Sequence, residues 1–88
     1  MSESLMAMKK ATKPGPPRTL MEAHEELVRI RPCRKDSLPV WLAYYQRSAA
    51  LYTEIAQIDP AHDGEAMYWA HRERRRAEEI AVQIRMQR

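Results

Sequence analysis

Residues 38–58 read LPVWLAYYQRSAALYTEIAQI, and this stretch decides the fold because it predicts one long α-helix. It contains no glycine, and Pro39 falls in the first turn, where the missing backbone N–H costs nothing. Ser37 stands at the N-cap position, where a hydroxyl can accept a backbone hydrogen bond. One stripe of the helix is polar: Gln46, Arg47, Thr53, Glu54 and Gln57. The apolar remainder is wider than one partner helix covers, so we expect this helix in the middle of the fold or facing another chain.

A shorter helix is predicted before it, over residues 19–31. Thr19 and Glu22 form a capping-box pattern, in which each side chain satisfies an orphan backbone N–H. Apolar residues follow at helical spacing up to Ile30. Pro32 disfavours helical geometry at Arg31 and ends the element. Residues 31–36, RPCRKD, then form a basic loop.

A third helix is predicted over residues 63–86. Pro60 stops the central helix, and Asp63 can cap the next one; Asp59 as N-cap with Pro60 as first residue is the alternative. A connection this short makes the two long helices antiparallel neighbours. The expected buried stripe is Ala66, Met67, Ala70, Ala77, Ile80, Ala81 and Ile84. The sequence therefore predicts an all-α, three-helix domain over residues 19–88, with a short N-terminal helix and a long antiparallel hairpin.

Residues 1–18 are predicted to be a flexible tail that is basic and rich in proline. Lys9, Lys10 and Lys13 precede the run PGPP, and the segment has little apolar surface to bury. It lacks the apolar core of a targeting segment, so a cytoplasmic location is expected, with Cys33 reduced.

Composition limits what the protein can be. Its 88 residues leave room for one small domain. One cysteine excludes an intramolecular disulfide framework, and two glycines are too few for a Gly-rich phosphate loop. No apolar run approaches the roughly 18 residues of a membrane span, so no membrane partner is expected.

Catalysis and metal binding are not expected. His24, His62, His71 and Cys33 lie on separate segments without the spacing of metal ligands. A domain this thin has little room for a pocket that would hold a cofactor or a small-molecule substrate. We therefore expect a protein that is not an enzyme.

Nucleic-acid binding is the alternative function. The net charge is +3, and the basic face of the third helix together with the lysines of the tail can contact phosphates. The residues concerned are His71, Arg72, Arg75, Arg76, Arg85, Arg88, Lys9, Lys10 and Lys13. Three glutamates are interleaved among them, and Glu78–Arg74 and Glu79–Arg75 are expected as i,i+4 ion pairs.

Protein binding is the favoured function because all six aromatic residues lie on the two long helices. Tryptophan and tyrosine are enriched at interface hot spots. Trp41, Tyr45 and Tyr52 are expected mainly in the core. The predicted contact surface is Trp41, Tyr44, Tyr68 and Trp69, with Arg72, Arg75 and Arg76 as a charged rim. A homodimer, made by pairing two hairpins into four helices, is as well supported as a foreign protein partner.

Two resemblances accompany this interpretation. The segment YTEIAQIDP at residues 52–60, followed by Ala66 and Ala70, resembles a single junction between tetratricopeptide repeats. The segments WLAYYQRSAALYTEIA at 41–56, EAMYWA at 65–70 with His62 before it, and AEEI at 77–80 resemble a family of short uncharacterised actinobacterial all-helical proteins, whose genes often lie near helix-turn-helix regulators. This second resemblance covers about residues 19–85 and implies a bacterial cytoplasmic protein in a regulatory setting.

Overall fold

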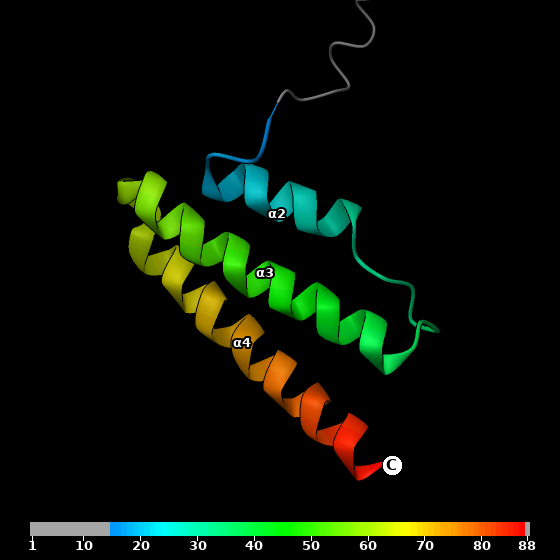
Figure 1. The fold of residues 1–88 in the computed structure, drawn as a ribbon. Coiled ribbons are helices and arrows are strands. Elements are labelled where there is room, and N and C mark those ends of the chain that lie inside the picture. The colour runs from blue at the N-terminus through cyan, green and yellow to red at the C-terminus, as the bar shows by residue number, and fades with distance from the viewer. Residues whose placement is uncertain (1–14, 88) are drawn as a thin grey trace, which may run out of the picture.

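The computed structural model describes residues 15–87, and these form a long helical hairpin with one shorter helix against it (Figure 1). The elements are α2 (Leu20–Arg29), α3 (Leu38–Ile58), the 3₁₀ turn η1 (Pro60–His62) and α4 (Asp63–Met86). The predicted all-α fold, a short helix followed by an antiparallel hairpin, is confirmed. Residues 1–14 of the predicted tail, and Arg88, lie outside the described residues.

Helix α2 begins with the predicted capping box. The backbone N–H of Glu22 donates to Thr19 Oγ1 at 3.1 Å, and the carboxylate of Glu22 accepts from the backbone N–H of Arg18 at 2.8 Å. A second contact at this end has no counterpart in the sequence pattern: the N–H of Leu20 donates to Asp59 Oδ2 at 3.1 Å. The end of α3 therefore supplies a cap for α2 across 39 residues of chain.

The junction between α3 and α4 combines the two predicted alternatives. Asp59 precedes Pro60, as in the second alternative, but Pro60 opens the 3₁₀ turn η1 and not α4 itself. The proposal that Asp63 caps the third helix is wrong, because Asp63 is the first helical residue and His62 stands at the N-cap. The carboxylate of Asp59 is engaged by Leu20 and by His62 Nδ1, at 3.1 Å each.

The core lies along the seam between α3 and α4 and under α2. Helix α4 contributes mainly small side chains there, and Ala66 and Ala70 are fully buried. Small residues at a contact let two helix axes approach closely. The buried apolar residues are Leu20, Ala23, Leu27, Tyr44, Tyr45, Ala49, Tyr52, Ile55, Ala66, Ala70, Ala77 and Ile80. Tyr45 and Tyr52 are thus in the core as predicted, whereas Trp41 is only half-buried.

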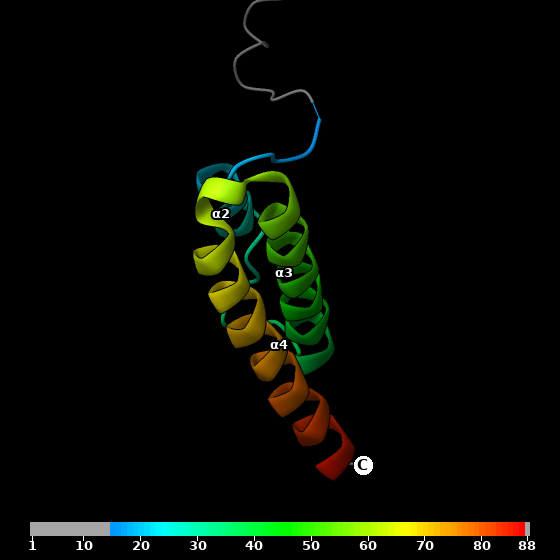
Figure 2. The same cartoon turned by 90° about the vertical axis from the view of Figure 1, so that its left-hand side faces the viewer.

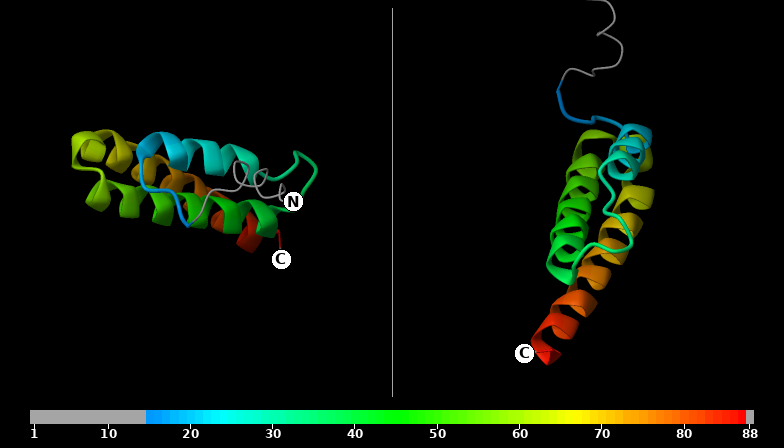
Figure 3. Two further views of the ribbon diagram at one scale, coloured as in Figure 1. Left: turned by 90° about the horizontal axis from the view of Figure 1, so that it is seen from above. Right: turned by 90° about the vertical axis from the view of Figure 1, so that its right-hand side faces the viewer.

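Two phenols of α3 anchor α2. The Tyr44 hydroxyl donates to the carbonyl oxygen of Leu27 at 3.0 Å, and the Tyr52 hydroxyl shares a hydrogen bond with His24 Nδ1 at 2.7 Å. Burial, followed by the charge of Glu73, raises the pKa of Tyr52 to about 12, so this phenol keeps its proton. These bonds, with that of Leu20 to Asp59, place α2 along α3 from Tyr44 to the end at η1, and Figures 2 and 3 show α2 at the η1 end of the hairpin.

Candidate functional site

Helix α2 is too short to cover the hairpin. It has 10 residues, against 21 in α3 and 24 in α4. After α2 ends, the chain runs as an irregular segment along the same face to the start of α3 (Figure 3). A groove is left between this segment and α4, over the first turns of α3.

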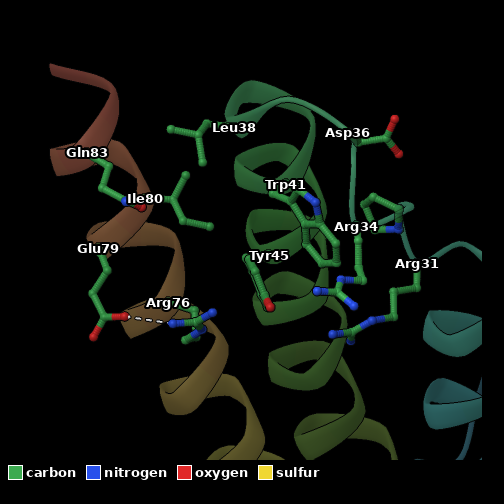
Figure 4. A pocket seen from close by; sticks show the side chains of 11 residues that line it. Arg31, Arg34, Asp36, Leu38, Trp41, Tyr45, Arg76, Glu79, Ile80 and Gln83 are labelled. Atoms are coloured by element: carbon green, nitrogen blue, oxygen red, sulfur yellow. Dashed lines mark hydrogen bonds and ion pairs between the residues drawn. The ribbon is translucent and has the colours of Figure 1, made fainter. Parts of the chain in front are cut away.

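The groove has a volume of about 430 Å³ and an aromatic floor. Trp41 and Tyr45 are stacked there, with ring centroids 5.7 Å apart and an interplanar angle of 29°. Leu38 of α3 and Ile80 of α4 extend the floor with aliphatic surface (Figure 4). The indole N–H of Trp41 donates to the Cys33 carbonyl oxygen at 3.2 Å, which fixes the ring against the loop.

Guanidinium groups line the groove on both sides. The ends of Arg31 and Arg34, from the loop, lie close together beside Trp41, and that of Arg76, from α4, lies on the other side of Tyr45 (Figure 4). The guanidinium carbon of Arg31 lies 5.1 Å from the Trp41 ring centroid, and that of Arg76 lies 5.4 Å from the Tyr45 centroid. Both distances are within the range of cation–π attraction. The aromatic floor therefore attracts two of the three cations, Arg31 and Arg76.

Two acids also line the groove, and each is already bonded. The carboxylate of Asp36 accepts from the Cys33 backbone N–H at 2.8 Å. Glu79 accepts from Arg76 Nη1 at 3.1 Å. Three cations and two anions leave the lining with a formal charge of +1. Within residues 15–87, Arg34 makes no side-chain hydrogen bond or ion pair, so its guanidinium is available to a ligand.

Glu73 lies next to the groove and is 7% exposed. Burial raises the pKa of its carboxyl, while Arg72, Arg31 and Arg76 lower it and only partly compensate. Arg72 Nη1 is 3.3 Å from Glu73 Oε2, and its guanidinium carbon lies 5.4 Å from the Trp69 ring centroid. The arginines on this face are therefore held partly by a buried anion and partly by aromatic rings.

The residues predicted for partner binding do not form one surface. Trp41 and Arg76 lie in the groove. Tyr44 is 8% exposed and bonded to α2, so its assignment to a contact surface is corrected: it is a core residue. Trp69 packs edge-on against His24 and is half-buried beneath α2.

The remaining predicted residues point elsewhere. Tyr68 is 61% exposed, and Arg75 is exposed on α4 outside the groove lining. The predicted i,i+4 pairing of Glu79 with Arg75 is wrong, since Glu79 bonds to Arg76 instead. Arg74, predicted to pair with Glu78, instead contacts His71 Nδ1 at 3.2 Å.

Sequence reasoning recognises the basic loop but not its role. Arg31 and Arg34 lie on either side of Pro32 and Cys33, a few residues before the helix that carries Trp41, and that proximity is the available signal. Glu73 is absent from the predicted buried stripe, although the spacing 66, 70, 73, 77, 80 places it on the seam itself.

In comparisons with known proteins, no protein-family model, curated protein or solved structure matches this chain. Within residues 15–87, no helix has the length and apolar character needed to cross a membrane. The same residues hold no cluster of three or more His, Cys, Asp or Glu arranged for a metal ion.

Proposed function

We propose that this chain is a small non-enzymatic module that binds a protein partner through the groove. The observation that carries the proposal is the mismatch in helix length, which leaves Trp41, Leu38 and Ile80 at the edge of the core under a ring of arginines. The groove combines a half-buried tryptophan with exposed arginines, and these two residue types are enriched in binding hot spots. The actinobacterial resemblance supports a role as a regulatory adaptor in the bacterial cytoplasm.

Nucleic-acid binding through α4 has weaker support. Arg72 and Arg76 are each bonded to a glutamate of the same helix, and both lie over aromatic rings. These contacts reduce the number of cations that are free to neutralise phosphates, and phosphate neutralisation supplies most non-specific affinity for nucleic acid. Self-association through the groove is a special case of the protein-binding proposal.

Site-specific photo-crosslinking in the native cell tests the proposal. The photoreactive residue benzoylphenylalanine is placed at Gln83, in the groove lining, and in a matched variant at Gln57, an exposed glutamine on the polar stripe of α3. We expect a discrete protein adduct at Gln83, several-fold more abundant than any adduct at Gln57. Equal yields at the two positions contradict the proposal, and adducts to nucleic acid at Gln83 replace it with the alternative. An adduct of twice the monomer mass identifies self-association.

A further inference from the structure

The residues that α2 buries indicate what kind of helix the face of the hairpin can bind. Leu20, Ala23 and Leu27, at positions i, i+3 and i+7, are buried against α3 and α4. The face continues beyond α2 with Leu38 and Trp41, which are half-buried, over Tyr45 and Ile80, which are buried. From Arg76 to Gln83, the part of α4 that lines the groove extends about 12 Å, which is about two helical turns. The uncovered face is thus long enough to contact a short stretch of another helix.

The arginines of the groove determine which charge a bound helix should carry. Arg31 and Arg34 stand beside the apolar floor, while Asp36 is bonded to the Cys33 N–H and Arg76 and Glu79 are bonded to each other. Arginine forms strong paired hydrogen bonds with carboxylates. A helix with leucine-like residues on one face and glutamates or aspartates beside them satisfies the floor and the rim together.

The chain's own acidic and basic segments fit less well. Residues 1–14 carry Lys9, Lys10 and Lys13 against Glu3, so the rim arginines repel this segment. In a second copy, the acidic residues Glu54, Asp59, Asp63 and Glu65 cluster around the turn of the hairpin and not along an apolar helix face. Such a contact between different surfaces generates open chains of subunits instead of a closed dimer.

We propose that the groove, between the loop at residues 31–36 and α4, binds an acidic amphipathic helix of a partner protein. This inference rests on the proposed function and names the chemistry of the partner. Arg31 is held by Trp41 for carboxylates that flank the apolar stripe, and Arg34 supplies a cation with no internal partner among residues 15–87; Arg76 is already bonded to Glu79. The recognition mode is a helix in a groove, with arginine contacts that set the sign of charge accepted.

The test uses the full chain and two synthetic peptides of about 14 residues, the length of four helical turns. Both peptides carry leucines at i, i+3 and i+7; one has glutamates beside them and its twin has lysines. Binding is measured by calorimetry at physiological salt. We expect the glutamate peptide to bind at least about tenfold more tightly than the lysine peptide.

A pair of charge-matched variants locates the site. Arg34→Glu changes an exposed groove residue, and Arg75→Glu changes an exposed residue of α4 outside the groove. Arg34→Glu is expected to weaken binding of the glutamate peptide about tenfold and to improve binding of the lysine peptide, whereas Arg75→Glu leaves both affinities within about twofold. Circular dichroism checks that both variants stay helical.

Three results overturn the inference: equal affinity for the two peptides, an equal effect of the two variants, or tighter binding of a single-stranded oligonucleotide than of the glutamate peptide. Sedimentation equilibrium supplies a fourth, because self-association that Arg34→Glu abolishes makes a second copy the occupant. If the Gln83 crosslink captures a protein but the glutamate peptide does not bind, the proposed function stands and the partner chemistry is wrong.

Discussion

The hydroxyl of Tyr44 donates a hydrogen bond to the carbonyl oxygen of Leu27 at 3.0 Å, and this bond marks where α2 stops covering α3. Leu27 lies near the C-terminal end of α2, where carbonyls lose their helical donors. The phenol therefore both satisfies an orphan acceptor and holds the helix end at the edge of the groove.

Replacing Tyr44 with phenylalanine is expected to lower the free energy of unfolding by about 1–3 kcal/mol, because a buried carbonyl loses its partner. Urea denaturation followed by circular dichroism measures the change. Tyr68→Phe is the matched control, since Tyr68 is 61% exposed and the loss of its hydroxyl is expected to be nearly neutral. Equal effects of the two substitutions contradict the anchoring role of Tyr44.

Low pH is expected to remove the contribution of the Asp59 carboxylate to the free energy of unfolding. The N–H of Leu20, and then His62, lower the pKa of the Asp59 carboxyl in the folded chain. A depressed folded-state pKa stabilises the fold above the ordinary aspartate value of about 4, and the contribution disappears as the pH falls through the folded-state value. Wild type should therefore be more stable than Asp59→Asn at pH 7, and the difference should shrink below about pH 4. Asp63→Asn, at an exposed aspartate in the first turn of α4, is the matched substitution for comparison.

The effect of Glu73 on the pH dependence of stability is expected to have the opposite sign to that of Asp59. Burial raises the pKa of its carboxyl in the folded chain, so the protonated form favours folding and the ionised form opposes it. Glu73→Gln should therefore unfold at higher urea concentration than wild type at pH 7, and this advantage should vanish as the pH is lowered to about 4. Glu78→Gln, at an exposed position on the same helix, serves as the control. A Glu73→Gln variant that is less stable at pH 7 would show that the ion pair with Arg72 outweighs desolvation.

Truncating Ile55 tests the hairpin seam. Ile55 is 0% exposed, so Ile55→Ala should cost about 2–5 kcal/mol in the free energy of unfolding through lost burial and a cavity. Ile58→Ala, one turn later and 39% exposed, should cost clearly less. Denaturation midpoints of the two variants measure the difference, and a larger effect at Ile58 would contradict the packing described.

The hairpin could be predicted because its signals are local. The signals are an unbroken apolar pattern over residues 38–58, a proline near each end and a short connection. Each can be recognised without knowing which distant residues are in contact. The contact of Asp59 with Leu20 could not be predicted in this way, since it joins residues 39 apart in sequence. The burial of Tyr44 likewise depends on how far α2 extends along α3.

The groove is beyond sequence reasoning for a related physical reason. It exists because a 10-residue helix sits at one end of a longer hairpin, and neither length alone locates the uncovered face. Trp41 and Arg76 are predicted as contact residues from their chemistry, whereas Arg31 and Arg34 acquire their importance only from the path of the loop across the face.

The most direct test follows the two indole N–H signals by two-dimensional ¹H–¹⁵N NMR during titration with the glutamate peptide. The Trp41 indole lies in the groove and donates to Cys33, whereas Trp69 packs against His24 beneath α2. We predict that the Trp41 signal shifts progressively to saturation while the Trp69 signal stays in place. A titration that moves Trp69 as far as Trp41, or that leaves Trp41 unmoved, would contradict the assignment of this groove as the binding site.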